Sequence, residues 1–347
     1  MTAARVYLDW NASAPLRPEA RAAMLAAMDA VGNPSSVHAE GRAAWAIVER
    51  ARIEIAALVG CGAEQVVFTS GATEAAALAA ASLPGLVGGG IEHDCVAAHL
   101  AGAVPVDSSG ALQAAPAGVP LAAQAANPET GVMQTRQGAL VDAVQAVGRT
   151  GWRLGAETRF ALLSAHKIGG PKGVGALIAA AAPSALLKGG GQEQGRRAGT
   201  ENVIGIAGFA AAAAAARGEF EAGVWDNVAA LRDRLEDALE AGAPGLDIIG
   251  RGAPRLPNTT CFAAPGWPGE TQVMAMDLAG FAVSAGSACS SGKVNRASRT
   301  LLAMGADKIT ASSALRVSIG PTTDEAEVMA FAGAWTAAYQ RRRAKAA

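Results

Sequence analysis

The chain has 347 residues, of which 51% are hydrophobic and 17% charged, and its formal net charge is −1. This composition excludes a largely disordered protein, which needs low hydrophobicity and high net charge, and it gives no electrostatic sign of nucleic-acid binding. Only 4% of residues are aromatic, and the 42 glycines exceed the usual share of roughly 7%. We therefore expect helices packed closely on a sheet rather than a β-sandwich, and the length allows two domains.

The first part of the chain alternates predicted helices with short predicted strands. A strand-like VYLDW comes first, and SGATEAAALAAASL begins a helix after the strand QVVFT. A polar, glycine-rich loop, KGGGQEQGRRAGTEN, is long enough to predict a functional role. The predicted helices cover 18–31 and 39–59, and the predicted strands cover 65–69, 140–142, 160–164 and 175–180.

The pattern changes near Arg217, where we place a domain boundary. Residues 14–217 are predicted to form a large domain, and residues 1–13 with 218–347 a small one. The predicted helices after the glycine-rich loop cover 204–217, 224–241, 270–279 and 324–340, and the predicted strands cover 246–250, 258–263 and 281–285. The apolar stretch 203–216 is shorter than the ~20 residues that span a bilayer, so no membrane contact is expected.

Four scattered cysteines, none in a C-x-x-C pair, predict a reduced protein. With no secretory signal at the N-terminus, we expect a cytoplasmic location. Cys289 lies among small residues in SAGSACSSG, which suits a nucleophile that travels on a loop. Cys61, Cys95 and Cys261 are interpreted as packing residues.

Two residues at the ends of predicted strands indicate a carbonyl cofactor. Lys167, between a predicted strand and GGPKG, suits either a surface lysine or a lysine that binds a cofactor as a Schiff base. Asp142 alone would be interpreted as a helix cap. Together with Lys167, it matches the carboxylate that pyridoxal phosphate (PLP) needs near its ring nitrogen.

Two further motifs fit the same cofactor. In TSGATE, at 69–74, the backbone N–H groups and the Thr73 hydroxyl make either an anion site or an ordinary helix cap. His93 could stack on a cofactor ring and move protons. His93, Cys95 and His99 also have a spacing that would suit a metal, but the other ligands of a closed site are missing, so none is predicted.

Together, these motifs resemble those of the NifS/IscS-type cysteine desulfurases, within the class V aminotransferase-like PLP enzymes. The resemblance covers nearly the whole chain. The motifs that carry it are YLDWNASAP, GNPSSVHAEGRAA, VVFTSGATEA, IEHD, DAVQAVG, SAHKIGGPKGVGAL, GGGQEQGRRAGTENV, LPNT, SAGSACSSG and ALRVSIGPTT.

The resemblance implies an α/β, aspartate-aminotransferase-type fold. A large domain would carry a mostly parallel, seven-stranded sheet, and a small α+β domain would join the N-terminal segment to the C-terminal part. The enzyme would be a homodimer with its site at the subunit interface.

The resemblance also implies roles for single residues. Lys167 would hold PLP, Asp142 would pair with its ring nitrogen, Gln145 would bond its phenolic oxygen, and His93 would stack on the ring. Arg316 would bind the substrate carboxylate, with Asn33 as a second candidate, and Cys289 would take the sulfur. The residues that would contact the phosphate or other parts of the cofactor are Ala72, Thr73, Ser164, His166, Asn127 and, from the other subunit, Thr200.

The implied reaction converts L-cysteine to L-alanine with a persulfide on Cys289. A sulfur-acceptor protein would then carry the sulfur to iron–sulfur clusters or thiolated cofactors. One alternative is selenocysteine lyase or another class V aminotransferase-type enzyme, although Cys289 argues against plain transamination. A second alternative is a non-catalytic binding partner with this fold, against which the retained catalytic set argues.

The chain departs from the family pattern between residues 127 and 142. Pro128 stands where the family usually has a second Asn, so that side-chain contact is lost or is made by Asn127. The stretch from Gly131 to Asp142 is too short for a crossover helix, so a loop must connect the strands. We therefore expect a large domain that lacks some peripheral helices.

Overall fold

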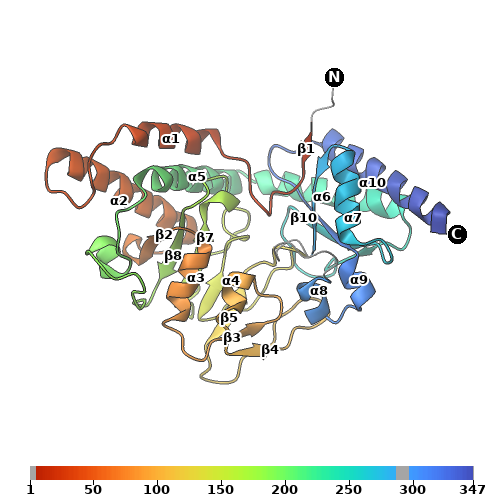
Figure 1. Cartoon of the computed structure of the whole chain (residues 1–347), viewed down its shortest axis with the longest axis horizontal. Coiled ribbons are helices and arrows are strands. Elements are labelled where there is room, and N and C mark those ends of the chain that lie inside the picture. The colour runs from red at the N-terminus through yellow and green to blue at the C-terminus, as the bar shows by residue number, and fades with distance from the viewer. Residues whose placement is uncertain (1–4, 287–296, 347) are drawn as a thin grey trace.

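The computed structural model describes residues 5–286 and 297–346, and it contains a larger and a smaller sheet side by side (Figure 1). The larger sheet has the strand order β2-β8-β7-β6-β5-β3-β4. Its strands are β2 (Val66–Thr69), β3 (Val87–Gly89), β4 (Gly102–Val104), β5 (Leu121–Gln124), β6 (Leu140–Asp142), β7 (Phe160–Ser164) and β8 (Gly175–Ala179). Only β8 runs antiparallel to its neighbours, which confirms the mostly parallel, seven-stranded sheet.

Helices cover both faces of this sheet, because successive side chains of a strand point to opposite sides. In β7, Phe160 and Leu162 pack in one cluster with α3 (Ala72–Ala80) and α4 (Asp94–Ala97). Ala161 and Leu163 pack in the other, with α2 (Ala39–Val59) and α5 (Val203–Glu221). α1 (Pro18–Met28) lies along α5 on the outside (Figure 1).

The helix α5 shows how an alanine-rich composition is used. It is the one helix in the described ranges that is long and apolar enough to cross a membrane by length and composition. Its buried face consists of small residues and two large ones, Ile206 and Phe209. These small side chains let α1 and α2 pack closely against α5 over the sheet.

Loops make three of the crossovers between strands of the larger sheet. Residues 105–120, 125–139 and 143–159 connect β4, β5, β6 and β7 in turn, and none of these described segments contains a helix. The loop expected before Asp142 is therefore present, and these three connections add no helix to either face of the larger sheet.

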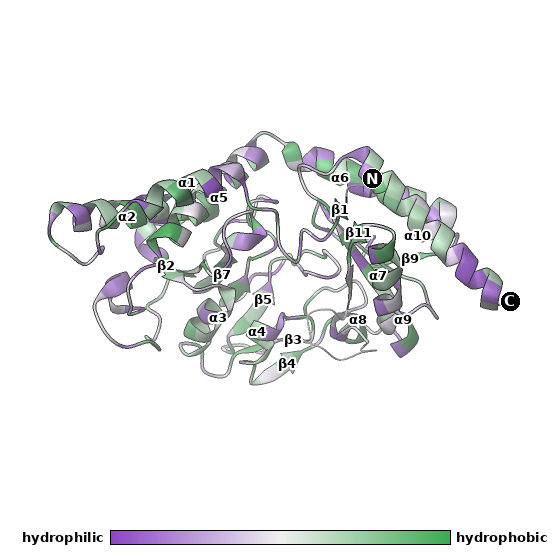
Figure 2. Cartoon of the chain, turned by 45° about the horizontal axis from the view of Figure 1, so that its top comes forward, coloured by the Kyte–Doolittle hydropathy of each residue, from purple (hydrophilic) through white to green (hydrophobic). Residues whose placement is uncertain are grey.

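The smaller sheet is antiparallel and has the order β12-β13-β10-β9. Its core is built around Trp335, which is fully buried and stacks on Tyr339 and Trp267. β1 (Val6–Tyr7) pairs in parallel with β11 (Phe281–Ala282), which ties the N-terminal segment to this part of the molecule. Figure 2 shows that the C-terminal end of α10 (Glu325–Ala346) is polar. The remaining elements are β1 (Val6–Tyr7), β9 (Asp247–Ile248), β10 (Thr259–Ala263), β11 (Phe281–Ala282), β12 (Ser284–Ala285), β13 (Ala314–Ser318), α6 (Val224–Gly242), α7 (Gly269–Leu278), α8 (Arg299–Ala303), α9 (Lys308–Ser312), α10 (Glu325–Ala346) and the 3-10 turns η1 (Ala63–Gln65), η2 (Ala165–Lys167) and η3 (Gln192–Gly195).

Several predicted helix ends are wrong: α1 ends at Met28 rather than at residue 31, and α10 continues to Ala346 rather than ending at residue 340. α5 continues through Gly218 to Glu221, because a glycine within a helix weakens it without ending it. Arg217, where we placed the domain boundary, therefore lies inside a helix, and the division of the chain into two domains stays a prediction.

Candidate active site

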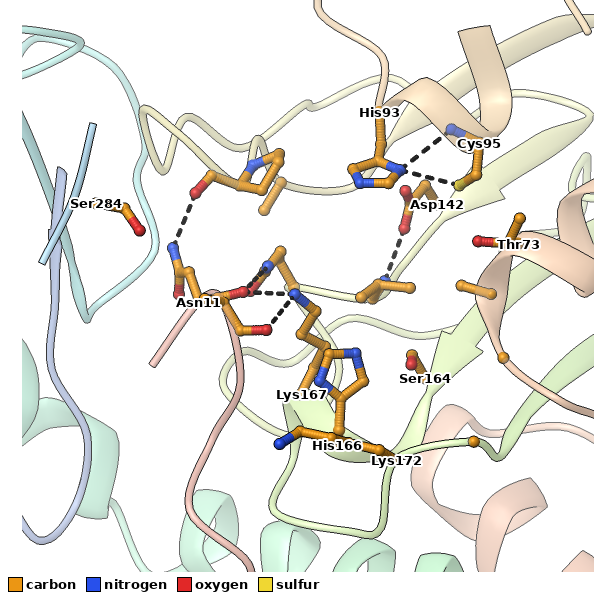
Figure 3. Close-up of a pocket in the computed structure, with 18 of the residues that line it drawn as sticks. Asn11, Thr73, His93, Cys95, Asp142, Ser164, His166, Lys167, Lys172 and Ser284 are labelled. Carbon is orange, nitrogen blue, oxygen red and sulfur yellow. Dashed lines mark hydrogen bonds between the residues drawn. The ribbon is translucent and has the colours of Figure 1, made fainter. Parts of the chain in front are cut away.

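A cavity of about 440 Å³ opens at the carboxyl ends of the parallel strands, where α/β sheets bind their ligands. The smaller sheet contributes to its wall through Ser284 and Arg316. Figure 3 shows side chains from several separate elements facing this space. The predicted residues that line the cavity are Lys167, His93, Asp142, Gln145, Ala72, Thr73, Ser164, His166 and Arg316.

Lys167 lies on the short turn η2 directly after β7, so the central strand fixes its position. Its Nζ donates hydrogen bonds to the backbone oxygens of Asn11, at 2.6 Å, and Ala12, at 2.9 Å. These carbonyls come from the N-terminal segment, which crosses from the smaller sheet to the larger one. The amine is thus held at the junction of the two sheets (Figure 3).

Asp142 ends β6 and faces the same cavity. Its Oδ1 accepts a hydrogen bond from the backbone N–H of Val144 at 3.0 Å. Burial raises the pKa of Asp142, while the Val144 hydrogen bond and the nearby His93 and Lys167 side chains act in the opposite direction. A cationic ring nitrogen next to this carboxylate would likewise favour its ionised form.

His93 caps the N-terminus of α4 with its own ring. Nδ1 accepts a hydrogen bond from the backbone N–H of Cys95 at 3.2 Å and lies 3.1 Å from Cys95 Sγ. Because Nδ1 is an acceptor, we assign the ring proton to Nε2. Burial raises the pKa of Cys95 to about 12, so this thiol stays protonated.

Cys95 was predicted to be a packing residue, and that prediction is incomplete. The thiol lines the cavity and contacts His93 as well as packing against the cluster around α3. Its position two residues after a candidate catalytic histidine was the only available signal.

The opposite end of the cavity suits an anion. α3 begins there without a side-chain cap, so its first N–H groups are available to a ligand beside Thr73 and Ser164. Lys172 adds a positive charge. Burial, together with Lys167, lowers the pKa of His166 to about 4, so this imidazole is neutral at pH 7.

Arg316 comes from β13 and is 5% exposed. Nη1 donates to the carbonyl of Pro128 at 3.0 Å, and Nη2 donates to Asp9 Oδ1 at 2.6 Å. Nε is buried and has no partner among the described residues. Nη1 and Nη2 each keep a second N–H, so this guanidinium, which lines the cavity, still has donors to offer a ligand.

A second buried guanidinium, Arg149, was missed by sequence reasoning. It donates to Asn11 Oδ1 at 2.7 Å, to Gln145 Oε1 at 2.7 Å and to the backbone oxygen of Lys167 at 2.8 Å. Burial lowers its pKa to about 9, with the positive charge of Arg316 adding to the effect. Its position four residues after Gln145, on the same turn, was the only sequence signal.

Three predicted residues of the described chain do not line the cavity. Asn127 is buried and holds the turn that follows it, since its Oδ1 accepts the N–H groups of Glu129 and Thr130 at 2.9 and 2.8 Å. Asn33 is exposed, and exposed Thr200 lines a neighbouring cavity of about 180 Å³. Cys289 lies outside the described residues.

The family model named aminotransferase class-V matches residues 6–105 and 129–331. The chain is 40% identical to a cysteine desulfurase of Cereibacter sphaeroides, with 93% of each protein covered. It is 37% identical to a cysteine desulfurase of Klebsiella pneumoniae, and the match covers 93% of this chain and 90% of that enzyme. Among solved structures, a NifS-like protein from Rickettsia africae superposes with a TM-score of 0.87 at 28% identity, over 97% of this chain and 99% of that one.

Proposed function

The chain belongs to the aminotransferase class-V family, and from that premise we propose that it is a PLP-dependent cysteine desulfurase that produces L-alanine and a persulfide on Cys289. The observation that carries the proposal is the convergence of Lys167, Asp142, His93 and Arg316 on one cavity. An amine, a carboxylate, an imidazole and a guanidinium are the groups that PLP chemistry on an amino acid requires.

The residues present fit the cofactor. The uncapped start of α3, with Thr73, Ser164 and Lys172, suits a phosphate, and Asp142 suits a pyridinium nitrogen. Arg316 has an orphaned buried Nε, which is a costly arrangement unless an anion occupies the site. When bound, the PLP ring withdraws electrons and so stabilises negative charge at the substrate Cα.

The side chains that line the cavity would divide the proton transfers. Lys167 would hold the cofactor and, when its amine is free, would take the proton from the substrate Cα, since its Nζ lies in the same cavity. His93, with its proton on Nε2, serves as a donor toward the cavity. Arg316 holds the substrate carboxylate and so fixes which bonds face Lys167.

The sulfur step belongs to Cys289. Its thiolate attacks the substrate sulfur, an S–S bond forms, and the C–S bond breaks with its electron pair left on the carbon side. Overall, L-cysteine and the Cys289 thiol become L-alanine and the Cys289 persulfide, so no external oxidant is needed.

The test uses the purified protein with PLP. The cofactor should give an absorption band at about 420 nm, and added L-cysteine should yield alanine and, with a reductant, sulfide. Cys289→Ser should keep the band and lose sulfide release, whereas Cys61→Ser should keep both. Full sulfide release by the Cys289→Ser protein would overturn the assignment.

We further propose a homodimer with shared sites and a sulfur-acceptor protein as its partner. Thr200 and Asn33 are exposed and lie outside their own chain's cavity, which supports a role in the cavity of a second copy. Val31 and Val37 flank Asn33 and are 93% and 88% exposed, so this loop offers apolar surface to such a copy. The described cysteines are free thiols, which suits the reducing cytoplasm.

A further inference from the structure

The carboxylate of Asp9 touches two residues of the cavity wall. Its Oδ1 accepts from Arg316 Nη2 at 2.6 Å, and its Oδ2 accepts from Ser284 Oγ at 2.7 Å. Ser284 and Arg316 are register partners on β12 and β13, and both line the cavity. Asp9 thus bridges two neighbouring side chains on one face of the smaller sheet.

These contacts fix the orientation of the Arg316 guanidinium. Asp9 holds it at Nη2 and the Pro128 carbonyl holds it at Nη1, so it cannot turn about its long side chain without losing both bonds. Arg316 lines the cavity, and Nη1 and Nη2 each carry a second N–H that these two bonds leave for a ligand. A bidentate match to a carboxylate depends on such an orientation.

The position of Asp9 is itself well determined. Its backbone bridges to Ser318 on β13, and its carbonyl oxygen accepts from Tyr7 Oη at 3.1 Å. Its side chain is 16% exposed and that of Arg316 is 7% exposed. An ion pair this sheltered holds its geometry better than a surface pair.

We propose that Asp9 is a positioning residue that orients the Arg316 guanidinium to bind the α-carboxylate of the amino-acid substrate. The inference rests on the proposed function, because it takes the ligand of Arg316 to be an amino acid. Asp9 also supplies the negative charge that a buried guanidinium needs when no substrate is bound.

A competing interpretation is that Asp9 blocks Arg316 and must be displaced by the substrate. The two interpretations predict opposite changes in the affinity for carboxylate-bearing ligands when Asp9 is replaced. If Asp9 positions Arg316, its loss weakens the binding of carboxylate-bearing ligands; if it blocks Arg316, its loss strengthens that binding.

The test variant is Asp9→Asn, which keeps the shape but removes the charge. We expect the KM for L-cysteine to rise by about tenfold, with kcat within about twofold of the original. Binding is then followed through the cofactor absorption with two amines, L-alanine and ethylamine. The affinity for L-alanine should fall by about tenfold and that for ethylamine, which has no carboxylate, by less than about twofold.

Ser284→Ala is the second variant, because it keeps the Asp9–Arg316 contact and removes only the bond that steadies Asp9. It should show the same selectivity between the two amines with a smaller loss, of about threefold for L-alanine. Equal losses for both amines, or tighter L-alanine binding in Asp9→Asn, would overturn the proposal. If the unaltered protein makes no alanine from L-cysteine but Asp9→Asn still weakens L-alanine selectively, the proposed function fails and the positioning role stands.

Discussion

Two buried carboxyl groups near the cavity link the stability of this protein to pH. Burial raises the pKa of Glu92 to about 8, and the negative charge of Asp142 acts in the same direction. Burial also raises the pKa of Glu129 to about 7, against hydrogen bonds from Ser298 and Thr300. The folded protein therefore holds these protons more tightly than the unfolded chain does.

The sign of the pH dependence follows from the raised pKa. Below about pH 4.5 both states are protonated at Glu92 and its contribution to stability is complete; as pH rises through about 8 the contribution is lost. The cofactor-free protein should thus lose up to about 1.4 kcal/mol of unfolding free energy per pH unit and per group in this window. Glu92→Gln should flatten the slope of unfolding free energy against pH, as measured by urea denaturation between pH 5 and about 8.

The control for this prediction is Glu157→Gln, which alters an exposed glutamate on a loop of the same sheet. Its slope should match that of the unaltered protein. An unchanged slope in Glu92→Gln would mean that Glu92 is ionised in the folded state across the whole range.

At the scale of elements, an ion pair fastens the glycine-rich loop 188–202 to the larger sheet. Arg52, on α2, pairs with Glu193 through two hydrogen bonds of 2.8 and 3.0 Å and also donates to the backbone oxygen of Val66. Glu193 accepts from the N–H of Phe68 as well. Glu193 and Gln194 both have positive φ, 49° and 58°, a conformation that side chains rarely adopt without such support.

Removing one partner of this pair should be costly. Arg52→Met leaves Glu193 buried without its charge partner, so we expect a loss of about 3–5 kcal/mol of unfolding free energy. Arg50→Met, two residues away on the exposed side of α2, should change it by less than about 0.5 kcal/mol. Urea denaturation of both variants checks this, and equal shifts would contradict it.

Element bounds were predictable where the local signal was strong. The helix 39–59 was predicted with its observed ends, because an amphipathic pattern is closed by Gly60 in the left-handed conformation, with φ of 74°. The strands β6 and β7 were also predicted with their observed bounds. By contrast, β3 (VGG) and β4 (GAV) have no β-branched pattern long enough to detect, since neighbouring strands rather than local propensity hold them.

Site residues could be predicted from the sequence only where the reactive group belongs to the side chain. Lys167 and Asp142 stand at strand ends and carry the groups that a PLP site needs, so their type and place sufficed to predict that both face one cavity. The contact of Lys167 with Asn11 uses a backbone oxygen, which every residue type offers. The contacts of Asp9 and Arg149 join segments far apart in the chain, and only the folded arrangement reveals them.

At the scale of the whole molecule, the proposed shared site makes a prediction about mixed subunits. If Thr200 serves the cavity of a second copy, Thr200→Val should weaken PLP affinity in the variant dimer, and Lys167→Ala should abolish the cofactor band. Subunits of the two variants, mixed and re-formed, should regain one native-like site per mixed dimer. In that site, Lys167 comes from one chain and Thr200 from the other.

The readout is the PLP titration of the mixture, with each variant alone as control. A fraction of tight sites that appears only after mixing supports the shared site. If mixing restores nothing although mixed dimers form, Thr200 acts within its own chain or not at all.

The loop crossovers of the larger sheet have a consequence for how the molecule opens. Helices shield β7 and β8 on both faces, whereas loops connect β4 to β5 and β5 to β6, and β4 is an edge strand. Amides in 87–104 should therefore exchange with deuterium through local openings well before those in 160–179, which should exchange only on global unfolding. Peptide-resolved exchange measured by mass spectrometry would show this order, and equal protection of the two stretches would mean that the loops shield the sheet as well as helices do.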